Sequence, residues 1–269
     1  MNQHFWADPE LPHLELRATS DGRSLCYGRH SHAEFSVGLI ESGRSLYLNG
    51  KQEQAVGPGD LVLMNPGAVH ACRAQDQTQA WGFTLLYVDP AWLAGLQSPA
   101  GGRFQPLAEK LLRRPGLSRA FRRLTQSLRR PDAFAREQHG LDFFSLLCAG
   151  AGVAEVEWPD ARLQRAVELL HDRCTEPLRL AEVAQVAGLS PNHLTRLFRA
   201  RFGLTPHAYL NDLRLRRSRM LLRASRLPLV EVALASGFAD QAHWQRQFRR
   251  QLAATPGQMR RQLAGRRMP

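Results

Sequence analysis

Two stretches near the C-terminus repeat one pattern, and this repeat limits the folds open to the chain more than any other feature. The first stretch covers residues 178–209 and the second covers residues 227–259. The turn glycines, Gly188 and Gly237, repeat at an offset of 49, and the Thr-Pro pairs that follow repeat at an offset of 50. One residue is therefore inserted within the unit, in a loop where insertions are tolerated. A duplication of this length predicts one supersecondary element used twice.

Each unit is expected to fold as a short helix, a turn at the glycine and a longer helix. The short helices are expected at residues 180–187 and 229–236. Glycine can adopt the positive φ that ends one helix before the next begins. In each longer helix the apolar residues recur at helical spacing, which predicts one buried face and an opposite face rich in arginine. This order of elements is typical of a helix-turn-helix motif, whose second helix enters the major groove of DNA.

The paired motifs resemble the AraC/XylS family of bacterial transcription regulators. The segment AGLSPNHLTRLFRARFGLTPHAYL and the later GF…F…TP pattern carry the resemblance, which covers residues 160–264. It implies an all-α DNA-binding domain with two helix-turn-helix motifs. It also implies that side chains on the longer helices contact base edges, because Arg can donate two hydrogen bonds to guanine and Asn or Gln can bind adenine.

The polar face of each longer helix supplies the expected DNA contacts. In the first unit these are Asn192, Thr195, Arg196 and Arg199. In the second unit they are Gln241, Ala242, His243, Gln245, Arg246 and Arg249. The second unit departs from the family pattern, because Ala253 stands where the first unit has Gly203 and Ala242 offers a base only a methyl group. We therefore expect the first unit to carry more of the sequence reading.

The excess positive charge of the chain lies on the duplicated segment. The chain has 269 residues and a net charge of +12. Residues 160–269 hold 20 arginines, no lysine and 8 acidic residues, whereas basic and acidic residues balance over residues 1–159. Such a distribution is typical of a protein that binds a polyanion. The alternative is a helical bundle with a solvated arginine-rich face, and the duplicated turn favours the DNA-binding interpretation.

Cysteine spacing and the N-terminus indicate the compartment. Cys26, Cys72, Cys148 and Cys174 are far apart and include no C-x-x-C pair, which fits reduced thiols better than a disulfide framework or a zinc site. The first residues lack the basic start and apolar run of a signal peptide, and no apolar stretch approaches the roughly 18 residues that span a bilayer. We expect a cytoplasmic protein with no membrane partner.

Residues 1–95 have the pattern of short strands separated by turns. Phe35 and Val37 alternate with small or polar residues, which is the two-residue period of a strand. Asn49-Gly50 is suited to a tight hairpin. Closely spaced strands without intervening helices predict a small antiparallel barrel or jelly roll. The chain as a whole is therefore expected to be an α+β multidomain protein.

A second resemblance concerns this N-terminal region. His30-Ser31-His32, Pro58-Gly59-Asp60 and Pro66-Gly67-x-x-His70 resemble the cupin-like ligand-binding domain that many AraC-family members carry. The resemblance implies a small-molecule effector. Residues 30, 32 and 34 would share one face if they alternate along one strand, and His70 could approach from another. The expected ligand-binding residues are His30, His32, Glu34 and His70.

The same four residues allow an alternative function. Imidazoles with a carboxylate can hold Zn²⁺, Fe²⁺ or Mn²⁺, so the chain could be a metal-dependent cupin enzyme joined to a DNA-binding domain. Metal cupins, however, place their acid farther beyond the second histidine than Glu34 lies here. A regulatory barrel needs only to bind its ligand. We therefore expect no enzyme activity, no catalytic residue, no cofactor and no metal.

Residues 96–155 are expected to form a helical region and linker that is a candidate homodimer interface. Helical spacing is present at residues 107–112, 117–128 and 134–149.

Farther on, a helix at residues 206–224 would join the two motifs. At 1.5 Å per residue it would be about 28 Å long, which suits recognition helices in successive major grooves roughly 34 Å apart.

The sequence thus predicts a transcription regulator in which a sensor domain controls a double helix-turn-helix domain. Double-stranded DNA and a small-molecule effector are the implied partners. The family mostly activates transcription, so the resemblance implies an activator that also contacts RNA polymerase. A regulator controlled by a protein partner in place of a ligand is the remaining alternative.

Overall fold

The computed structural model describes residues 3–8, 10–23, 26–32, 34–50, 52–76, 79–98, 102–154, 160–252 and 254–264. The strands are β1 Gln3–Asp8, β2 Leu11–Thr19, β3 Cys26–His30, β4 Phe35–Ser42, β5 Ser45–Asn49, β6 Gln52–Val56, β7 Leu61–Met64, β8 His70–Ala74, β9 Gly82–Val88 and β10 Leu111–Leu112. The helices are α1 Pro90–Gln97, α2 Pro115–Ser127, α3 Ala133–Ala151, α4 Ala161–Asp172, α5 Leu180–Ala187, α6 Pro191–Phe202, α7 Pro206–Ala224, α8 Leu229–Ala235, α9 Gln241–Leu252 and α10 Pro256–Ala264.

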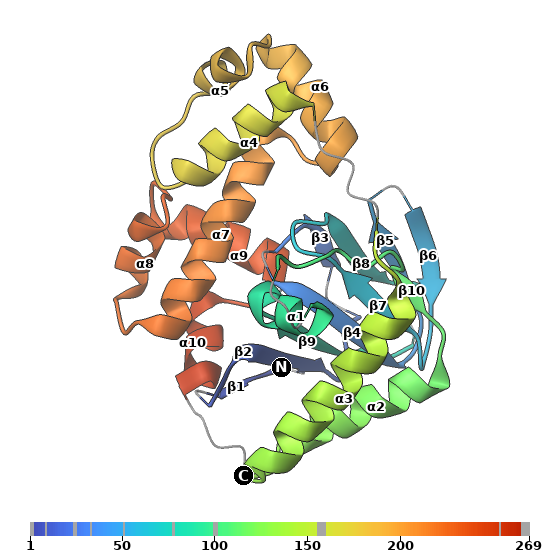
Figure 1. Ribbon diagram of the computed structural model, residues 1–269. Helices are drawn as coiled ribbons and strands as arrows, with labels where there is room; N and C mark the ends of the chain where they lie inside the picture. The colour runs from blue at the N-terminus through green and yellow to red at the C-terminus, as the bar shows by residue number, and fades with distance from the viewer. Residues whose placement is uncertain are drawn as a thin grey trace.

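Two antiparallel sheets form the N-terminal part of the molecule. The larger has the strand order β1-β2-β9-β4-β7-β10, and the smaller has the order β3-β8-β5-β6. Along β4, Val37 and Leu39 belong to a core shared with α1–α3, whereas Ile40 packs with Tyr47 and Val56 of the smaller sheet. Because side chains alternate along a strand, both faces of the larger sheet are buried. The layers are the small sheet, the large sheet and the α2–α3 helix pair (Figure 1).

The predicted antiparallel β domain is confirmed, and one predicted helix is wrong. Asn49 pairs with Gln52 across a tight turn in which Gly50 has a φ of +62°, so the predicted hairpin is present. Residues 107–112 are not helical, however: Leu107 forms an isolated bridge with Val153, and Leu111–Leu112 form β10, which pairs with β7. Leu107 and Leu112 are buried against the large sheet. Burial on the sheet edge therefore overrides a helical spacing that is only two turns long.

The C-terminal part is all helical, as predicted. The first unit contains α4–α6, the second contains α8–α10, and α7 joins them over the predicted residues 206–224. Gly188 ends α5 with a φ of +67°, as the sequence predicts. A Cβ on Gly237, whose φ is +89°, would lie 2.7 Å from Cα of Thr175, so the second turn needs glycine both for its backbone and for this close approach.

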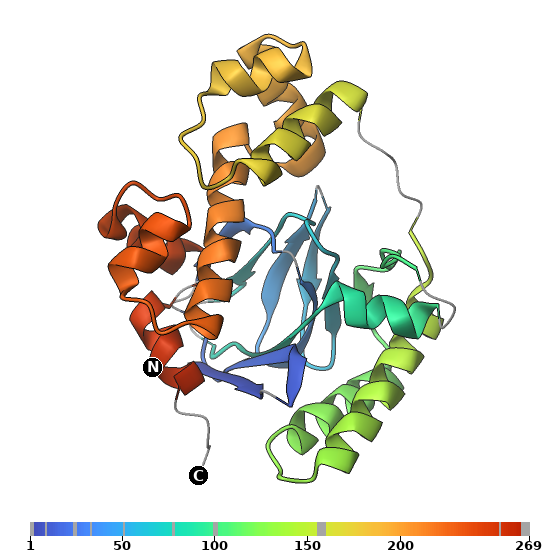
Figure 2. The same cartoon turned by 60° about the vertical axis from the view of Figure 1, so that its left-hand side comes forward.

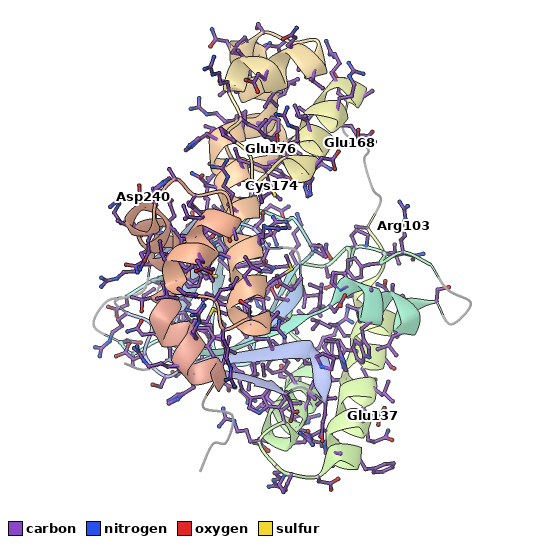
Figure 3. The ribbon with its side chains drawn as sticks, turned by 90° about the vertical axis from the view of Figure 1, so that its left-hand side faces the viewer. Arg103, Glu137, Glu168, Cys174, Glu176 and Asp240 are labelled. Atoms are coloured by element: carbon purple, nitrogen blue, oxygen red, sulfur yellow. The ribbon has the colours of Figure 1, made fainter. Side chains whose placement is uncertain are left out.

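The two units differ in where they lie. The first unit projects from one end of α7, away from the sheets, whereas the second lies along α7 next to β1 (Figure 2). Arg214 of α7 donates hydrogen bonds to the carbonyl oxygens of Cys174 and Glu176, which fixes the turn after α4 on α7 (Figure 3). No helix in the described ranges is both long and apolar enough to cross a membrane.

Candidate nucleic-acid interface and ligand site

The first predicted recognition helix, α6, has the two-faced character that the sequence predicts. Its N-terminus is capped by Ser190, whose hydroxyl accepts a hydrogen bond from the backbone N–H of His193 at 3.3 Å. Leu194 and Phe198 are fully buried. The predicted contact residues Asn192, Arg196 and Arg199 are exposed, and Thr195 is half-buried. The Thr195 hydroxyl donates to the carbonyl oxygen of Pro191 at 2.9 Å, so it remains free to accept a hydrogen bond.

The second recognition helix, α9, repeats this arrangement. Asp240 caps it by accepting a hydrogen bond from the backbone N–H of His243 at 2.6 Å, and it lies at the edge of the molecule (Figure 3). Trp244 and Phe248 are fully buried. The predicted contact residues Ala242, Arg246 and Arg249 are exposed, and Gln241, His243 and Gln245 are half-buried.

Among the described residues, the side chain of His243 has two neighbours that hold it. Its ring lies edge-on to Phe238 at 5.6 Å between centroids, and Gln247 lies 3.5 Å from its Nε2. A side chain held in this way is less free to turn toward a base. Ala253, which distinguishes the second unit in the sequence, lies outside the described residues.

Four of the arginines on the two recognition helices are available for an external partner. Arg196, Arg199, Arg246 and Arg249 take part in none of the ion pairs formed by the described residues. On α7, in contrast, Arg216 and Arg219 are paired with carboxylates. Unpaired, exposed guanidinium groups on a helix face can bind phosphate oxygens or guanine edges.

The three predicted histidines come together, but not from a single strand. His30 is the last residue of β3, His32 lies in the connection to β4, and His70 begins β8. The prediction that residues 30, 32 and 34 alternate along one strand is therefore wrong. The ring centroid of His70 lies 4.3 Å from that of His30 and 4.8 Å from that of His32. The pairing of β3 with β8 sets His30 opposite His70, and the connection after β3 places His32 beside them.

Backbone carbonyl groups fix the orientation of two of these histidine rings. In each case Nδ1 donates to a backbone carbonyl, from His32 to Glu34 at 2.8 Å and from His70 to Ala68 at 2.9 Å. Nε2 of His32 then accepts from the hydroxyl of Ser36 at 3.1 Å. Burial, followed by the neighbouring imidazoles, lowers the pKa of His32 well below its usual value and lowers that of His70 to about 3.

The fourth predicted residue, Glu34, has a different partner. Its carboxylate lies 3.5 Å from Nη1 of Arg219 on α7. Burial acts to raise the pKa of Glu34, but the attraction of Arg219 and neighbouring arginines lowers it overall. Among the described residues there is no group of three His, Cys, Asp or Glu side chains arranged to hold a metal ion. The structure thus brings the histidines together and directs the carboxylate toward the DNA-binding part.

A cavity of about 50 Å³ lies between the two sheets beside the histidines. His30, His70 and Arg17 form its polar side, and Met64 and Trp81 are among its apolar residues. Small-molecule sites usually have volumes of roughly 300–1,000 Å³. In this conformation the space between the sheets therefore fits water but not a metabolite.

A buried polar contact joins the histidine region to α7, and the sequence alone did not indicate it. The hydroxyl of Ser31 donates to Oδ2 of Asp212 at 2.6 Å, and the Ser31 backbone N–H donates to Oδ1 at 3.2 Å. Arg216 binds the same carboxylate at 2.5 Å, and Gln251 of α9 donates to it as well. Asp212 is therefore shared by the connection after β3, the helix α7 and the second recognition helix. Only the i,i+4 spacing of Asp212 and Arg216 was visible in the sequence.

A second contact lies one turn farther along α7. Arg219 lies 3.4 Å from Glu15 of β2 as well as near Glu34, and its guanidinium stacks over the ring of Tyr87 at 4.8 Å. Arg223 lies 3.2 Å from the same Glu15. Arg219 and Glu15 are both nearly completely buried. Removing Arg219 would leave Glu15 with only the partly exposed Arg223, and removing Glu15 would leave Arg219 with only Glu34.

Comparison with known proteins identifies relatives of both parts. A family model described as an AraC-like ligand binding domain matches residues 15–147, and a helix-turn-helix domain model matches residues 183–262. The transcriptional regulator YbfI of Bacillus subtilis is 27% identical over 86% of each chain. The arabinose operon regulatory protein of Salmonella typhimurium is 26% identical over 84% of this chain and 83% of its own. ToxT from Vibrio cholerae has a similar fold, with a TM-score of 0.62 at 13% identity over 94% of this chain and all of that one.

Proposed function

Because the chain belongs to the AraC family of transcription regulators, with a ligand-binding domain followed by a helix-turn-helix DNA-binding domain, we propose that α6 and α9 bind double-stranded DNA together. One observation carries the proposal. Equivalent positions of the two helices present exposed arginines with no carboxylate partner among the described residues. Since α7 is about 28 Å long, the helices can enter successive major grooves roughly 34 Å apart.

The proposed DNA contacts are the predicted ones, divided by what each side chain can do. Arg196 and Arg246 occupy equivalent positions near the middle of α6 and α9, where a guanidinium can reach a guanine edge. Arg199 and Arg249 follow one turn later and suit phosphate contacts. Because His243 packs on Phe238 and Ala242 offers only a methyl group, the first unit carries more of the base reading.

The proposed control is a ligand-dependent change at the contact between the sensor and α7. His30 and His70 border the space between the sheets, and Ser31, which contacts Asp212, lies between His30 and His32 in the sequence. A ligand that opens this space would have to bind one domain arrangement better than the other in order to regulate DNA binding. Here His30, His32 and His70 would bind the effector, and Glu34 would act through Arg219.

Regulation is proposed here, and catalysis is not. Nε2 of His32 is occupied by the Ser36 hydroxyl and Glu34 is held by Arg219, so two of the four candidate metal ligands already have protein partners.

We infer activation as the sign of regulation, since the transcriptional activator RhaS of Enterobacter sp. is 35% identical over 47% of this chain and 45% of its own length. An activator of this kind acts in the cytoplasm and contacts RNA polymerase.

Homodimerisation through α3 is part of the proposal. Phe134, Leu141 and Leu146 of α3 have 79%, 37% and 55% of their surface exposed. Exposed apolar residues along one helix are typical of a protein interface. A second copy of the chain would cover them and would bind a DNA site with two related halves.

Selection of genomic DNA fragments by the purified full-length chain tests the function. We expect a recurring sequence in the bound fragments. The variant Arg196→Ala/Arg246→Ala is expected to lose that selectivity, whereas the control Arg129→Ala/Arg130→Ala, which removes two exposed arginines of the α2–α3 turn, should keep it. Fragments without a common sequence, or equal loss in both variants, would contradict sequence-specific binding.

A further inference from the structure

A second cavity, of about 630 Å³, lies where the sensor meets both helix-turn-helix units. It is bordered by the end of β3, the turn between α6 and α7, the first half of α7 and the last turns of α9. Its volume is within the range of small-molecule sites, unlike the cavity of about 50 Å³ between the sheets. The space that fits a metabolite in this conformation is therefore outside the sheets.

Three arginines from three different elements line this cavity. They are Arg29 of β3, Arg199 of α6 and Arg250 of α9. All three are exposed, and none takes part in the ion pairs of the described residues. Arg29 reaches the first unit, where Gly203 follows α6. If Gly203 carried a Cβ, that atom would lie 3.4 Å from Nη1 of Arg29. Three positive charges from separate parts of the chain thus converge on one space.

The carboxylate that lines the cavity cannot neutralise these charges. Asp212 is bound by Ser31, Arg216 and Gln251, and it is almost completely buried. Its charge is therefore compensated within the contact between sensor and α7. The excess positive charge of the cavity is left for an external anion.

A buried amide adds a hydrogen-bonding group to the cavity wall. Asn211 is only 8% exposed, and its Oδ1 accepts no hydrogen bond from the described residues. Its Nδ2 lies 3.4 Å from Nδ1 of His207, which also lines the cavity. Leaving a buried polar atom without a partner costs about 1–3 kcal/mol, so a bound ligand or water that pairs with this amide is favoured.

We propose that this cavity binds a small polar anion with more than one negative charge, of the phosphorylated or polycarboxylate class. Guanidinium groups bind phosphate and carboxylate oxygens in pairs, and Arg29, Arg199 and Arg250 can act from three sides. The rest of the wall contains both polar residues, such as His207 and Gln247, and apolar ones, such as Leu215, so the preference for a multiply charged anion comes from the arginines. A neutral sugar would leave the arginines without a charged partner, and the single carboxylate of a fatty acid would neutralise only one of the three charges.

Binding at this place would act directly on DNA recognition, a consequence that rests on the proposed function. Arg199 is a proposed phosphate contact of the first unit, and Arg250 follows the last proposed contact of the second. An anion that holds Arg199 competes with a DNA phosphate for the same group. Anion and DNA would then weaken each other's binding by the same factor.

Calorimetric titration of the DNA-free chain with sodium pyrophosphate, at constant ionic strength, tests the site itself. We expect saturable binding with one pyrophosphate per chain. Arg29→Gln and Arg250→Gln should each weaken binding by about tenfold, the loss expected for one charged hydrogen-bonding group. The control Arg226→Gln removes another exposed arginine of the DNA-binding part and should leave binding unchanged. Thermal melting of each variant verifies its fold. Absence of saturable binding, or equal binding in all variants, would overturn the proposal.

A second measurement separates this site from the DNA surface. Pyrophosphate is expected to lower the DNA affinity of the wild-type chain more than sodium chloride does at the same ionic strength, and Arg29→Gln should remove the difference. If Arg29→Gln and Arg250→Gln weaken DNA binding and neither affects pyrophosphate, the cavity belongs to the DNA surface and the anion proposal is wrong. A chain that binds pyrophosphate but no DNA would contradict the proposed function and leave the anion site standing.

Discussion

The two helix-turn-helix units have the same internal architecture but different attachments to the sensor. The second unit shares a core with β1, since Phe5 packs in the cluster that contains Trp244 and Phe248. Arg17 of β2 also donates a 2.6 Å hydrogen bond to the carbonyl oxygen of Leu252 at the end of α9. In the first unit, Val69 is the sensor residue that joins the hydrophobic cluster.

This difference indicates which unit a signal would move. The second unit is fixed to the sensor by apolar packing and buried hydrogen bonds, whereas the first is held mainly through α7. A change in the sensor therefore shifts the second unit directly and changes its orientation relative to the first. If both recognition helices enter successive grooves, as proposed above, a small rotation between the units is enough to change DNA affinity.

Substitution of the equivalent core phenylalanines should have the largest effect on the stability of the two units and should show how differently they are attached to the sensor. Phe198→Ala and Phe248→Ala each remove a fully buried ring, and each should destabilise its own unit by about 3–5 kcal/mol. Hydrogen exchange of the full chain is the measurement. We expect Phe198→Ala to lower protection in α4–α6 alone, and Phe248→Ala to lower it in β1 also. Identical patterns in the two variants would show that the units are equally attached.

Removal of Arg219 tests the polar part of the attachment. Arg219→Ala removes the buried partner of Glu15 and Glu34 and leaves Glu15 with the partly exposed Arg223, so it should destabilise the contact between the domains by at most about 3–5 kcal/mol. Chemical unfolding followed by tryptophan fluorescence measures the change. The control Met220→Ala alters an exposed neighbour on the same helix and should have little effect. Equal stability of the two variants would show that the ion pair does not hold the domains together.

The recognition helices should differ in their contribution to DNA affinity. Arg196→Ala is expected to weaken binding to a selected site by about 1–3 kcal/mol and to relax preference at one base pair, and Arg246→Ala should cost less. Fluorescence anisotropy with specific and random duplexes distinguishes the two effects. If Arg196→Ala weakens both duplexes equally, Arg196 contacts only phosphate.

The smallest expected effect concerns pH. Burial keeps His70 neutral in the folded chain, with a pKa of about 3, whereas an unfolded histidine has a pKa near 6.5. Between these values the unfolded chain binds the extra proton, so stability is lost as pH falls. From pH 7 to pH 5 the free energy of unfolding should drop by up to about 2 kcal/mol from His70.

Urea unfolding of the wild type and of His70→Asn at the two pH values measures how much His70 contributes to the change in the free energy of unfolding. We expect the free energy of unfolding of the variant to differ less between pH 7 and pH 5 than that of the wild type. An unchanged difference would mean that His70 is already solvated in the folded chain.

Local patterns predicted the DNA-binding part in detail. The bounds of α7 agree with the predicted residues 206–224, and Leu194, Phe198, Trp244 and Phe248 are buried as their spacing required. These features depend on helical periodicity, on capping by Ser190 and on the positive φ of Gly188, all of which are encoded within a few residues. The histidines were also singled out correctly as a group, although their positions on strands were not.

Contacts between distant segments could not be predicted in this way. The partners Ser31 and Asp212 are separated by 181 positions, and Arg219 and Glu15 by 204. Neither pair shares a local pattern, since each depends on how two domains pack. Residues 107–112 were predicted wrongly for the same reason, because the open edge of the large sheet decided their conformation.

By itself the sequence determined two helix-turn-helix units, an antiparallel sensor and the faces that each recognition helix exposes, because these follow from short-range periodicity and turn chemistry. Only the tertiary structure decided that Glu34 pairs with α7, that the second unit is built onto the sensor and that three arginines meet around one cavity. Those outcomes depend on the burial of charge and apolar surface between domains, which no stretch of the chain encodes alone.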